Sequence, residues 1–180
     1  MKISINKSTL ELVGGDITKQ ATEAIVNAAN STLLGGAGVD GAIHQAGGPQ
    51  ILEECKKIGG CPTGEARITM GGKLSAKYVI HAVGPVYRGG KKGEAQLLAS
   101  AYQSSLALAS QYQIQSISFP SISTGAYNYP MEEAARIALT TVRDYLQDHP
   151  EIKLVRFVLF GQAAYETYCQ VLDQLTQPKS

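Results

Sequence analysis

The feature that most constrains the fold is the nearly unbroken apolar run LVRFVLF at residues 154–160. A strand with one solvated face alternates apolar and polar residues, whereas a run that is apolar almost throughout predicts a strand buried on both faces. Such strands belong to parallel sheets that helices cover on both sides. The run therefore predicts an α/β protein with a layered core.

Shorter apolar runs alternate with helical patterns along the rest of the chain. The predicted strands cover residues 3–5, 9–13, 24–29, 66–70, 78–83 and 117–119. The predicted helices cover residues 41–58 with a break at 47–49, then 94–112, 130–147 and 163–175. Strands that alternate with helices indicate an α/β sandwich with a mixed sheet. Because no linker, repeat or low-complexity segment interrupts the pattern, we expect one domain over residues 1–180.

Charge and cysteine content exclude several classes of function. The formal net charge of +1 gives no overall basic footprint for nucleic acid, and the cluster RGGKK at residues 88–92 is interpreted as a solvated loop. Three cysteines without a C-x-x-C pair argue against a disulfide framework and against a zinc site. The sequence shows neither a signal peptide nor a membrane-spanning run. We therefore expect a cytoplasmic protein without a metal.

The segment GGAGVDGAIH at residues 35–44 contains the spacing G-x-G-x-x-G. In a dinucleotide-binding unit this pattern comes directly off a strand, and an acidic residue follows about 20 residues later. Here residues 30–34 separate the glycines from the predicted strand, and IGGCP at residues 58–62 contains no acid. Both requirements fail, so we reject hydride transfer with a nicotinamide cofactor. The Walker A pattern is also absent, because Leu74 follows Gly72-Lys73.

Two loops of small residues each lead into a predicted helix. The glycine run precedes a helix that we expect to begin near Gly41, and SISTGAY at residues 121–127 precedes one that opens at Pro130. Backbone N–H groups and helix N-termini of this kind can hold a diphosphate without a cation. Neither loop contains Lys or Arg, which argues against phosphoryl transfer. The alternative for the glycine run is a connector or a turn with Asp40 as N-cap.

Six motifs together resemble the macrodomain family. They are GDIT at 15–18, VNAAN at 26–30, GVDGAIH at 38–44, CPTGEA at 61–66, VIH with VGP at 79–85, and FP through STG at 119–125. The match spans almost the whole chain, and GVDGAIH and STGAY resemble the MacroD-type branch. The resemblance implies a three-layer α/β/α sandwich with a central mixed, mostly parallel sheet. It also implies a hydrolase that removes mono-ADP-ribose from acidic side-chain esters and deacetylates O-acetyl-ADP-ribose.

The resemblance also assigns binding residues. Asp16 is expected to accept a hydrogen bond from the adenine amino group with the Ile17 amide beside it, and Phe160 to stack on adenine. The diphosphate and distal ribose are expected to be lined by Gly38, Val39, Ser123, Thr124, Gly125, Ala126 and Tyr127. From the residues alone, a turn residue is the favoured interpretation of Asp16, and a core aromatic is the alternative for Phe160.

The chemistry that the resemblance implies depends on two residues. Asn30 positions the distal ribose, and Asp40 orients or deprotonates the attacking water, with no metal or other cofactor. His44, one turn after Asp40, is interpreted as a structural partner, and His81 as a core residue. Two alternatives stay open: an ADP-ribose reader without turnover, and a phosphatase acting on ADP-ribose 1″-phosphate. The expected partners are ADP-ribose, its esters and mono-ADP-ribosylated proteins, with a monomer as the default.

Three positions depart from the family pattern. Ala37 and Asn128 stand where glycine is common, and Gly161 stands where a small polar residue is common. Asn tolerates the left-handed backbone region better than most residues, so Asn128 is acceptable. None of the departures removes a catalytic group, and we expect Ala37 and Gly161 to alter affinity only.

Overall fold

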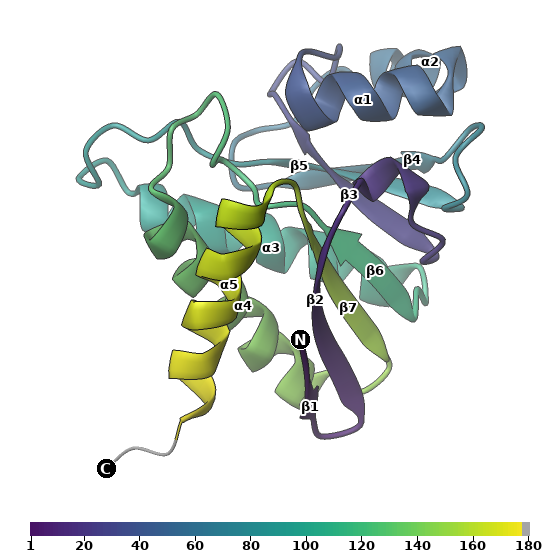
Figure 1. Cartoon of the computed structure of the whole chain (residues 1–180). Helices are drawn as coiled ribbons and strands as arrows, with labels where there is room; N and C mark the ends of the chain where they lie inside the picture. Colours follow the sequence, from purple (N-terminus) through teal and green to yellow (C-terminus); the bar gives the residue numbers. More distant parts are fainter. Residues whose placement is uncertain (178–180) are drawn as a thin grey trace.

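The computed structural model describes residues 1–177 and contains one seven-stranded sheet (Figure 1). Its strands are β1 Lys2–Ile5, β2 Ser8–Gly14, β3 Ala24–Ala29, β4 Ala66–Met70, β5 Tyr78–Val83, β6 Ser116–Phe119 and β7 Leu154–Leu159. Their order is β1-β2-β7-β6-β3-β5-β4, and only the outer pairs β1/β2 and β4/β5 are antiparallel. The prediction of a mixed, mostly parallel sheet is therefore confirmed.

Helices cover both faces of the sheet. They are α1 Gly38–Gly47, α2 Pro49–Ile58, α3 Glu94–Gln111, α4 Met131–Asp148 and α5 Gln162–Thr176, with a short 3₁₀ helix η1 at Ile17–Lys19. In Figure 1, α1 and α2 lie on one side of the sheet, and α3, α4 and α5 lie on the other. Two separate apolar clusters fill the space beneath these layers. The fold is thus a three-layer α/β/α sandwich, as the resemblance implied.

Strand β7 shows why the sandwich has two cores. Its adjacent residues Phe157 and Val158 belong to different apolar clusters. Phe157 lies in the cluster beneath α3–α5, and Val158 lies in the cluster beneath α1–α2. Successive side chains of a strand point to opposite faces, so a central strand must be apolar at almost every position. The apolar run that predicted this strand reflects that requirement.

Two helix starts differ from the sequence-based expectation. Helix α1 begins at Gly38, not near Gly41, and Ala37 is its N-cap in an extended conformation with φ −96° and ψ −177°. Asp40 therefore lies inside the first turn, and its interpretation as an N-cap is wrong. Helix α4 begins at Met131, with Pro130 as its N-cap. The extended conformation at Ala37 is open to any residue, which explains why alanine replaces glycine there without strain.

The loop before α3 is organised around a single carboxylate. Glu94, in the first turn of α3, accepts hydrogen bonds from the backbone N–H groups of Arg88, Gly90 and Lys92. Burial acts to raise the pKa of Glu94, but these N–H donors outweigh it and lower the pKa to about 2. The basic cluster RGGKK is thus a loop wrapped around a buried acid, with its own basic side chains exposed.

Within the described residues, none of the helices combines the length and apolar character that crossing a membrane requires.

We expect the Glu94→Gln variant to have a melting temperature roughly 2–5 °C lower than wild type at pH 7. Because the pKa of Glu94 is about 2 in the folded state against an ordinary value of 4.5, its stabilisation is complete above pH 4.5 and is lost as the pH falls toward 2. The difference between variant and wild type should therefore shrink over that interval. Thermal unfolding followed by circular dichroism would measure it. Glu133→Gln, at an exposed position in the first turn of α4, is the control. A difference that stays constant with pH would contradict this account.

Candidate functional site

A cavity of about 490 Å³ opens where several parallel strands end. In doubly wound α/β sheets, ligands bind outside the carboxyl ends of the strands, where the connections diverge to opposite faces. Here the lining comes from the segments that follow β2, β6 and β7 and from the first turns of α1, α4 and α5. The lining residues are Gly15, Asp16, Ile17, Gly38, Val39, Ala42, Pro120, Ser121, Thr124, Gly125, Met131, Val158, Phe160 and Ala164.

The structure brings seven of the predicted binding residues to this cavity. They are Asp16, Ile17, Gly38, Val39, Thr124, Gly125 and Phe160. The other predicted residues, which are Asn30, Asp40, Ser123, Ala126 and Tyr127, do not form part of its lining. Both predicted loops therefore border one cavity, which is the arrangement that two dipolar loops around a diphosphate require.

Asp16 has a structural function as well as a place in the cavity wall. It is the N-cap of η1, and its Oδ1 accepts hydrogen bonds from the backbone N–H and the hydroxyl of Thr18, at 2.9 and 2.7 Å. These two bonds hold the pKa of Asp16 below its usual range. The carboxylate is therefore ionised and fixed in orientation. Its Oδ2 has no hydrogen-bond partner within residues 1–177, so an acceptor oxygen is available to a ligand.

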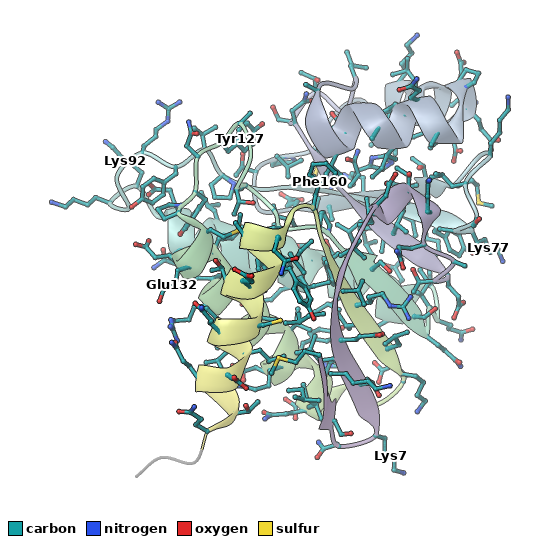
Figure 2. The ribbon with its side chains drawn as sticks, viewed as in Figure 1. Lys7, Lys77, Lys92, Tyr127, Glu132 and Phe160 are labelled. Carbon is teal, nitrogen blue, oxygen red and sulfur yellow. The ribbon has the colours of Figure 1, made fainter. Side chains whose placement is uncertain are left out.

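Phe160 lies on the surface, so its interpretation as a core aromatic is wrong. It follows the last residue of β7, and 87% of its surface is exposed. Figure 2 shows it at the turn between β7 and α5. The next residue, Gly161, has φ +95° and is the N-cap of α5. A large aromatic ring exposed at a cavity rim is suited to stacking on a planar ligand group.

The glycine run owes its composition to the close approach of two backbone segments. A methyl group on Gly41 would lie 2.5 Å from the carbonyl oxygen of Gly36. A methyl group on Gly36 would lie 3.2 Å from Oδ2 of Asp40 and 3.6 Å from Nδ2 of Asn30. The glycines therefore allow the loop to pack directly on α1, above the two predicted catalytic residues.

The side chain of Asn30 is hydrogen-bonded to the glycine run and to the residues that precede it. Its Nδ2 donates to the carbonyl of Gly35 at 3.0 Å, and its Oδ1 accepts from the hydroxyl of Thr32 at 2.6 Å and from the N–H of Leu33 at 3.2 Å. The carbonyl side of the amide is thus fully occupied within the protein. Nδ2 has a second N–H with no acceptor among the described residues, and this nitrogen lies close to Gly36.

Asp40 is a buried carboxylate whose two oxygens have different surroundings. Only 5% of its surface is exposed. Oδ1 accepts a hydrogen bond from Nδ2 of Asn27 at 2.8 Å, and Nε2 of His44 lies 3.3 Å from the same oxygen. Oδ2 faces the glycine run at Gly36. The structure thus places His44 beside Asp40, as the sequence indicated, and directs one carboxylate oxygen toward the loop.

The second loop is held by hydrogen bonds within itself and by bonds to neighbouring segments. Ser123 has φ +69°, and its buried hydroxyl packs against Gly84, where a methyl group would lie 2.2 Å from Oγ. Thr124 Oγ1 donates to Ser121, and the N–H of Tyr87 donates to the carbonyl of Tyr127 at 2.9 Å. The side chain of Ser123 is therefore directed at the adjacent loop and not at the cavity.

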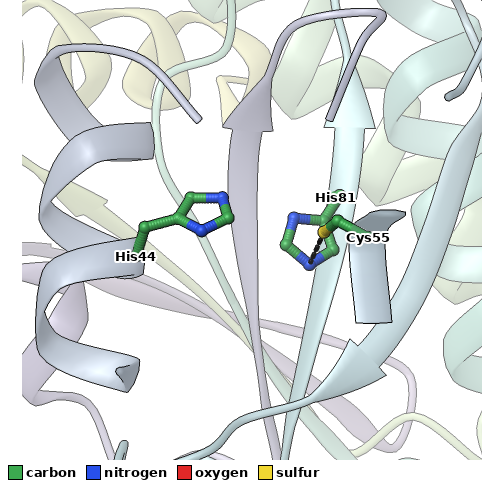
Figure 3. A group of neighbouring side chains, drawn as sticks. All are labelled: His44, Cys55 and His81. Atoms are coloured by element: carbon green, nitrogen blue, oxygen red, sulfur yellow. Dashed lines mark hydrogen bonds between the residues drawn. The ribbon is translucent and has the colours of Figure 1, made fainter. Parts of the chain in front are cut away.

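Sequence reasoning missed a buried polar cluster behind Asp40. His81 is buried, as predicted, but its ring contacts Asn27, Thr69 and Cys55. The possible metal-ligand atoms of His44, Cys55 and His81 all lie within 4.8 Å of one another (Figure 3). Both ring nitrogens of His81 already have hydrogen-bond partners, and burial raises the pKa of the Cys55 thiol to about 11. These contacts favour a neutral hydrogen-bonded cluster over a metal centre. The one available signal was Asn27, a polar residue inside a buried strand.

We expect Gly41→Ala to weaken the affinity for ADP-ribose, the ligand that the sequence resemblance implies, by roughly ten-fold or more. The added methyl group would meet the Gly36 carbonyl oxygen at 2.5 Å, so the loop must move away from α1. Isothermal titration calorimetry measures the effect. Ala46→Ser, at an exposed position of the same helix, is the control and should bind like wild type. Unchanged affinity in Gly41→Ala would show that the loop position is unimportant for binding.

Comparison with known proteins agrees with this geometry. Residues 26–138 match the macro domain family. A macro domain-containing protein of Caldanaerobacter subterraneus subsp. tengcongensis is 58% identical, over 94% of this chain and 98% of its own length. A protein of Salmonella gallinarum named O-acetyl-ADP-ribose deacetylase is 50% identical, over 93% of this chain and 96% of its own length.

Solved structures give the same result. An Oceanobacillus iheyensis macrodomain, determined with ADP, superposes with a TM-score of 0.94 at 47% identity and covers 97% of this chain and 95% of that one. A Trypanosoma brucei macrodomain in complex with ADP-ribose superposes with a TM-score of 0.86 at 43% identity, over 91% of this chain and 68% of that one. The cavity and its two loops have the arrangement that the sequence motifs predicted. The family match and these relatives show that this chain belongs to the macro domain family.

Proposed function

We propose that this protein binds ADP-ribose and hydrolyses esters at its distal ribose, releasing mono-ADP-ribose from acidic side chains and the acetyl group from O-acetyl-ADP-ribose. The observation that carries the proposal is the division of the Asp40 carboxylate, with Oδ1 bound inside the protein and Oδ2 facing the glycine run. A protein that only binds ADP-ribose has no need of a buried carboxylate beneath this loop. The deacetylase name of the Salmonella relative supports the same reaction.

The cavity suits each part of the ligand. Its volume lies within the usual range of small-molecule sites. Asp16 presents a fixed acceptor oxygen for the adenine amino group, and Phe160 presents a ring for stacking. The N-terminal ends of α1 and α4 supply partial positive charge for the diphosphate without a cation. Thr124 and Gly125 close the cavity from the opposite loop.

The reaction then needs only a correctly placed water. The water oxygen forms a bond to the reacting carbon of the ester, and the bond to the leaving oxygen breaks with its electron pair on that oxygen. The products are a free carboxylic acid and a free ribose hydroxyl. Oδ2 of Asp40 orients the water, accepts its proton and passes a proton on to the leaving oxygen, which becomes the hydroxyl, while the remaining N–H of Asn30 holds the ribose nearby. Orientation and proton transfer are each able to supply a large part of such a rate enhancement.

We expect Asp40→Asn to lower the rate of ester hydrolysis by roughly 10²–10⁴-fold while ADP-ribose affinity changes little. The amide keeps the shape of the carboxylate and an oxygen for the Asn27 donor, but it cannot take up a proton. The assay is release of ADP-ribose from a protein modified on Asp or Glu, with calorimetry alongside. Asp148→Asn, at an exposed position at the end of α4, is the control and should match wild type.

The outcomes separate the candidate functions. Tight binding by wild type without any release would make the protein a reader. Release of phosphate from ADP-ribose 1″-phosphate, without ester hydrolysis, would make it a phosphatase. No binding of ADP-ribose would show that the two-loop cavity is not the ligand site.

We expect Phe160→Ala to weaken ADP-ribose binding by roughly 5- to 150-fold, because a base stacked on an aromatic ring gains about 1–3 kcal/mol. Since the ring is 87% exposed, its removal should leave the melting temperature almost unchanged. Val86→Ala, another exposed apolar residue, is the control. If both variants bound ADP-ribose with equal affinity, Phe160 would not be part of the adenine site.

A further inference from the structure

Behind Asp40, a line of buried polar groups runs across the sheet. Asn27 on β3 and His81 on β5 are directly opposite each other in the parallel register, and Thr69 lies on the next strand, β4. Asn27 and His81 are completely buried, and 3% of Thr69 is exposed. Polar side chains are rarely placed so deep unless their hydrogen bonds are satisfied. The pairing of donors and acceptors along this line can therefore be worked out.

The pairing has one consistent direction. Only an N–H group can face the Asp40 carboxylate, so the amide nitrogen of Asn27 is the atom 2.8 Å from Oδ1. The same nitrogen lies 3.1 Å from Nδ1 of His81, so Nδ1 must be the acceptor and the ring proton must be on Nε2. Nε2 then donates to Thr69 Oγ1 at 2.9 Å, and that hydroxyl donates to the carbonyl of Met70 at 3.0 Å.

Asn27 depends on these two bonds for its orientation. Its carbonyl oxygen, Oδ1, is buried and has no hydrogen-bond partner in the described part of the chain. The side-chain amide is therefore held through its nitrogen alone, by Asp40 on one side and by His81 on the other. A rotated amide would bring the carbonyl oxygen against the carboxylate, which repels it. The lone pair on Nδ1 of His81 opposes this rotation.

We propose that His81 is a positioning residue for the hydrolysis reaction: as a neutral ring protonated on Nε2, it holds the Asn27 amide so that Asp40 Oδ1 is fixed and Oδ2 faces the glycine run. The proposal rests on the function proposed above and extends it to residues that line no part of the cavity. Asp40 orients the water and accepts its proton. Asn27, His81 and Thr69 hold the Asp40 carboxylate in its orientation.

The surroundings of His81 keep the ring neutral. Burial, and to a smaller extent a charge on His44, whose ring centroid lies 6.2 Å away, together lower the pKa of His81 to about 3. The other groups that face the ring are the uncharged Asn27 and Thr69, the Cys55 thiol from α2, and Asp40 beyond Asn27. A protonated ring would have no lone pair on Nδ1, and Asn27 would lose its second acceptor.

The first test determines directly which ring nitrogen of His81 carries the proton. Long-range ¹H–¹⁵N correlation spectra of the wild-type protein at pH 7 distinguish a ring protonated on Nε2 from one protonated on Nδ1 or on both nitrogens. We expect His81 to be protonated on Nε2 only, with and without ADP-ribose. Either other form would overturn the proposal, because Asn27 would then face a donor.

The second test uses Thr69, which is remote from the cavity. Thr69→Val keeps the shape of the side chain and removes the acceptor for Nε2–H, whereas Thr69→Ser keeps the hydroxyl. We expect Thr69→Val to lower kcat roughly ten-fold with KM and ADP-ribose affinity nearly unchanged, and Thr69→Ser to retain most of kcat. A purely structural effect would lower stability and affinity together in proportion to kcat.

The failures of the two proposals are distinguishable. If wild type hydrolyses the ester and Thr69→Val keeps its full kcat, the positioning role is overturned and the proposed function stands. If wild type binds ADP-ribose without hydrolysis, the proposed function is overturned and the positioning role falls with it. His81→Gln offers a further check in a folded variant, and it should reduce kcat more than it reduces affinity.

Discussion

A carboxylate is costly to bury unless hydrogen-bond donors replace the water that it loses, and the region around Asp40 is built to meet this requirement. The donor is the amide of Asn27, and it comes from the central strand β3. This position places the Asn27 amide in a core that is mostly apolar, and the amide therefore requires hydrogen-bond partners of its own. The polar line through His81 and Thr69 follows from this one buried charge.

The sheet determines where the cavity forms. Four parallel pairings align the carboxyl ends of β2, β7, β6, β3 and β5 at one edge, so the segments that leave these strands meet there. Helices α1 and α4 then begin at this edge from opposite layers and direct their N-termini at the same space. Backbone dipoles thereby provide the positive potential that Lys or Arg supplies in many phosphate sites. The loops themselves need small residues, because their backbones must approach both the ligand and the helix beneath.

The likeness to known proteins extends over most of the chain. The chain shares about half of its residues with relatives that include a protein named O-acetyl-ADP-ribose deacetylase, and it superposes on macrodomains solved with ADP and ADP-ribose. The departures from the family pattern are mild in structural terms. Ala37 has an ordinary extended backbone, and Asn128 has φ +60°, a conformation that asparagine tolerates. Gly161 has φ +95°, where a larger residue would be strained.

The order of strands and helices, the two-sided burial of β7 and the two small-residue loops could all be predicted from the sequence, because local periodicity and turn chemistry act over a few residues. Its motifs also indicated the family and seven of the fourteen residues that line the cavity. The folded structure was needed to show that Asp40 lies inside the first turn of α1, that Phe160 is exposed, and that the side chain of Ser123 is directed away from the cavity. It alone brought Asn27, His81 and Thr69 into line, since cross-strand neighbours are set by sheet register between segments far apart in the chain.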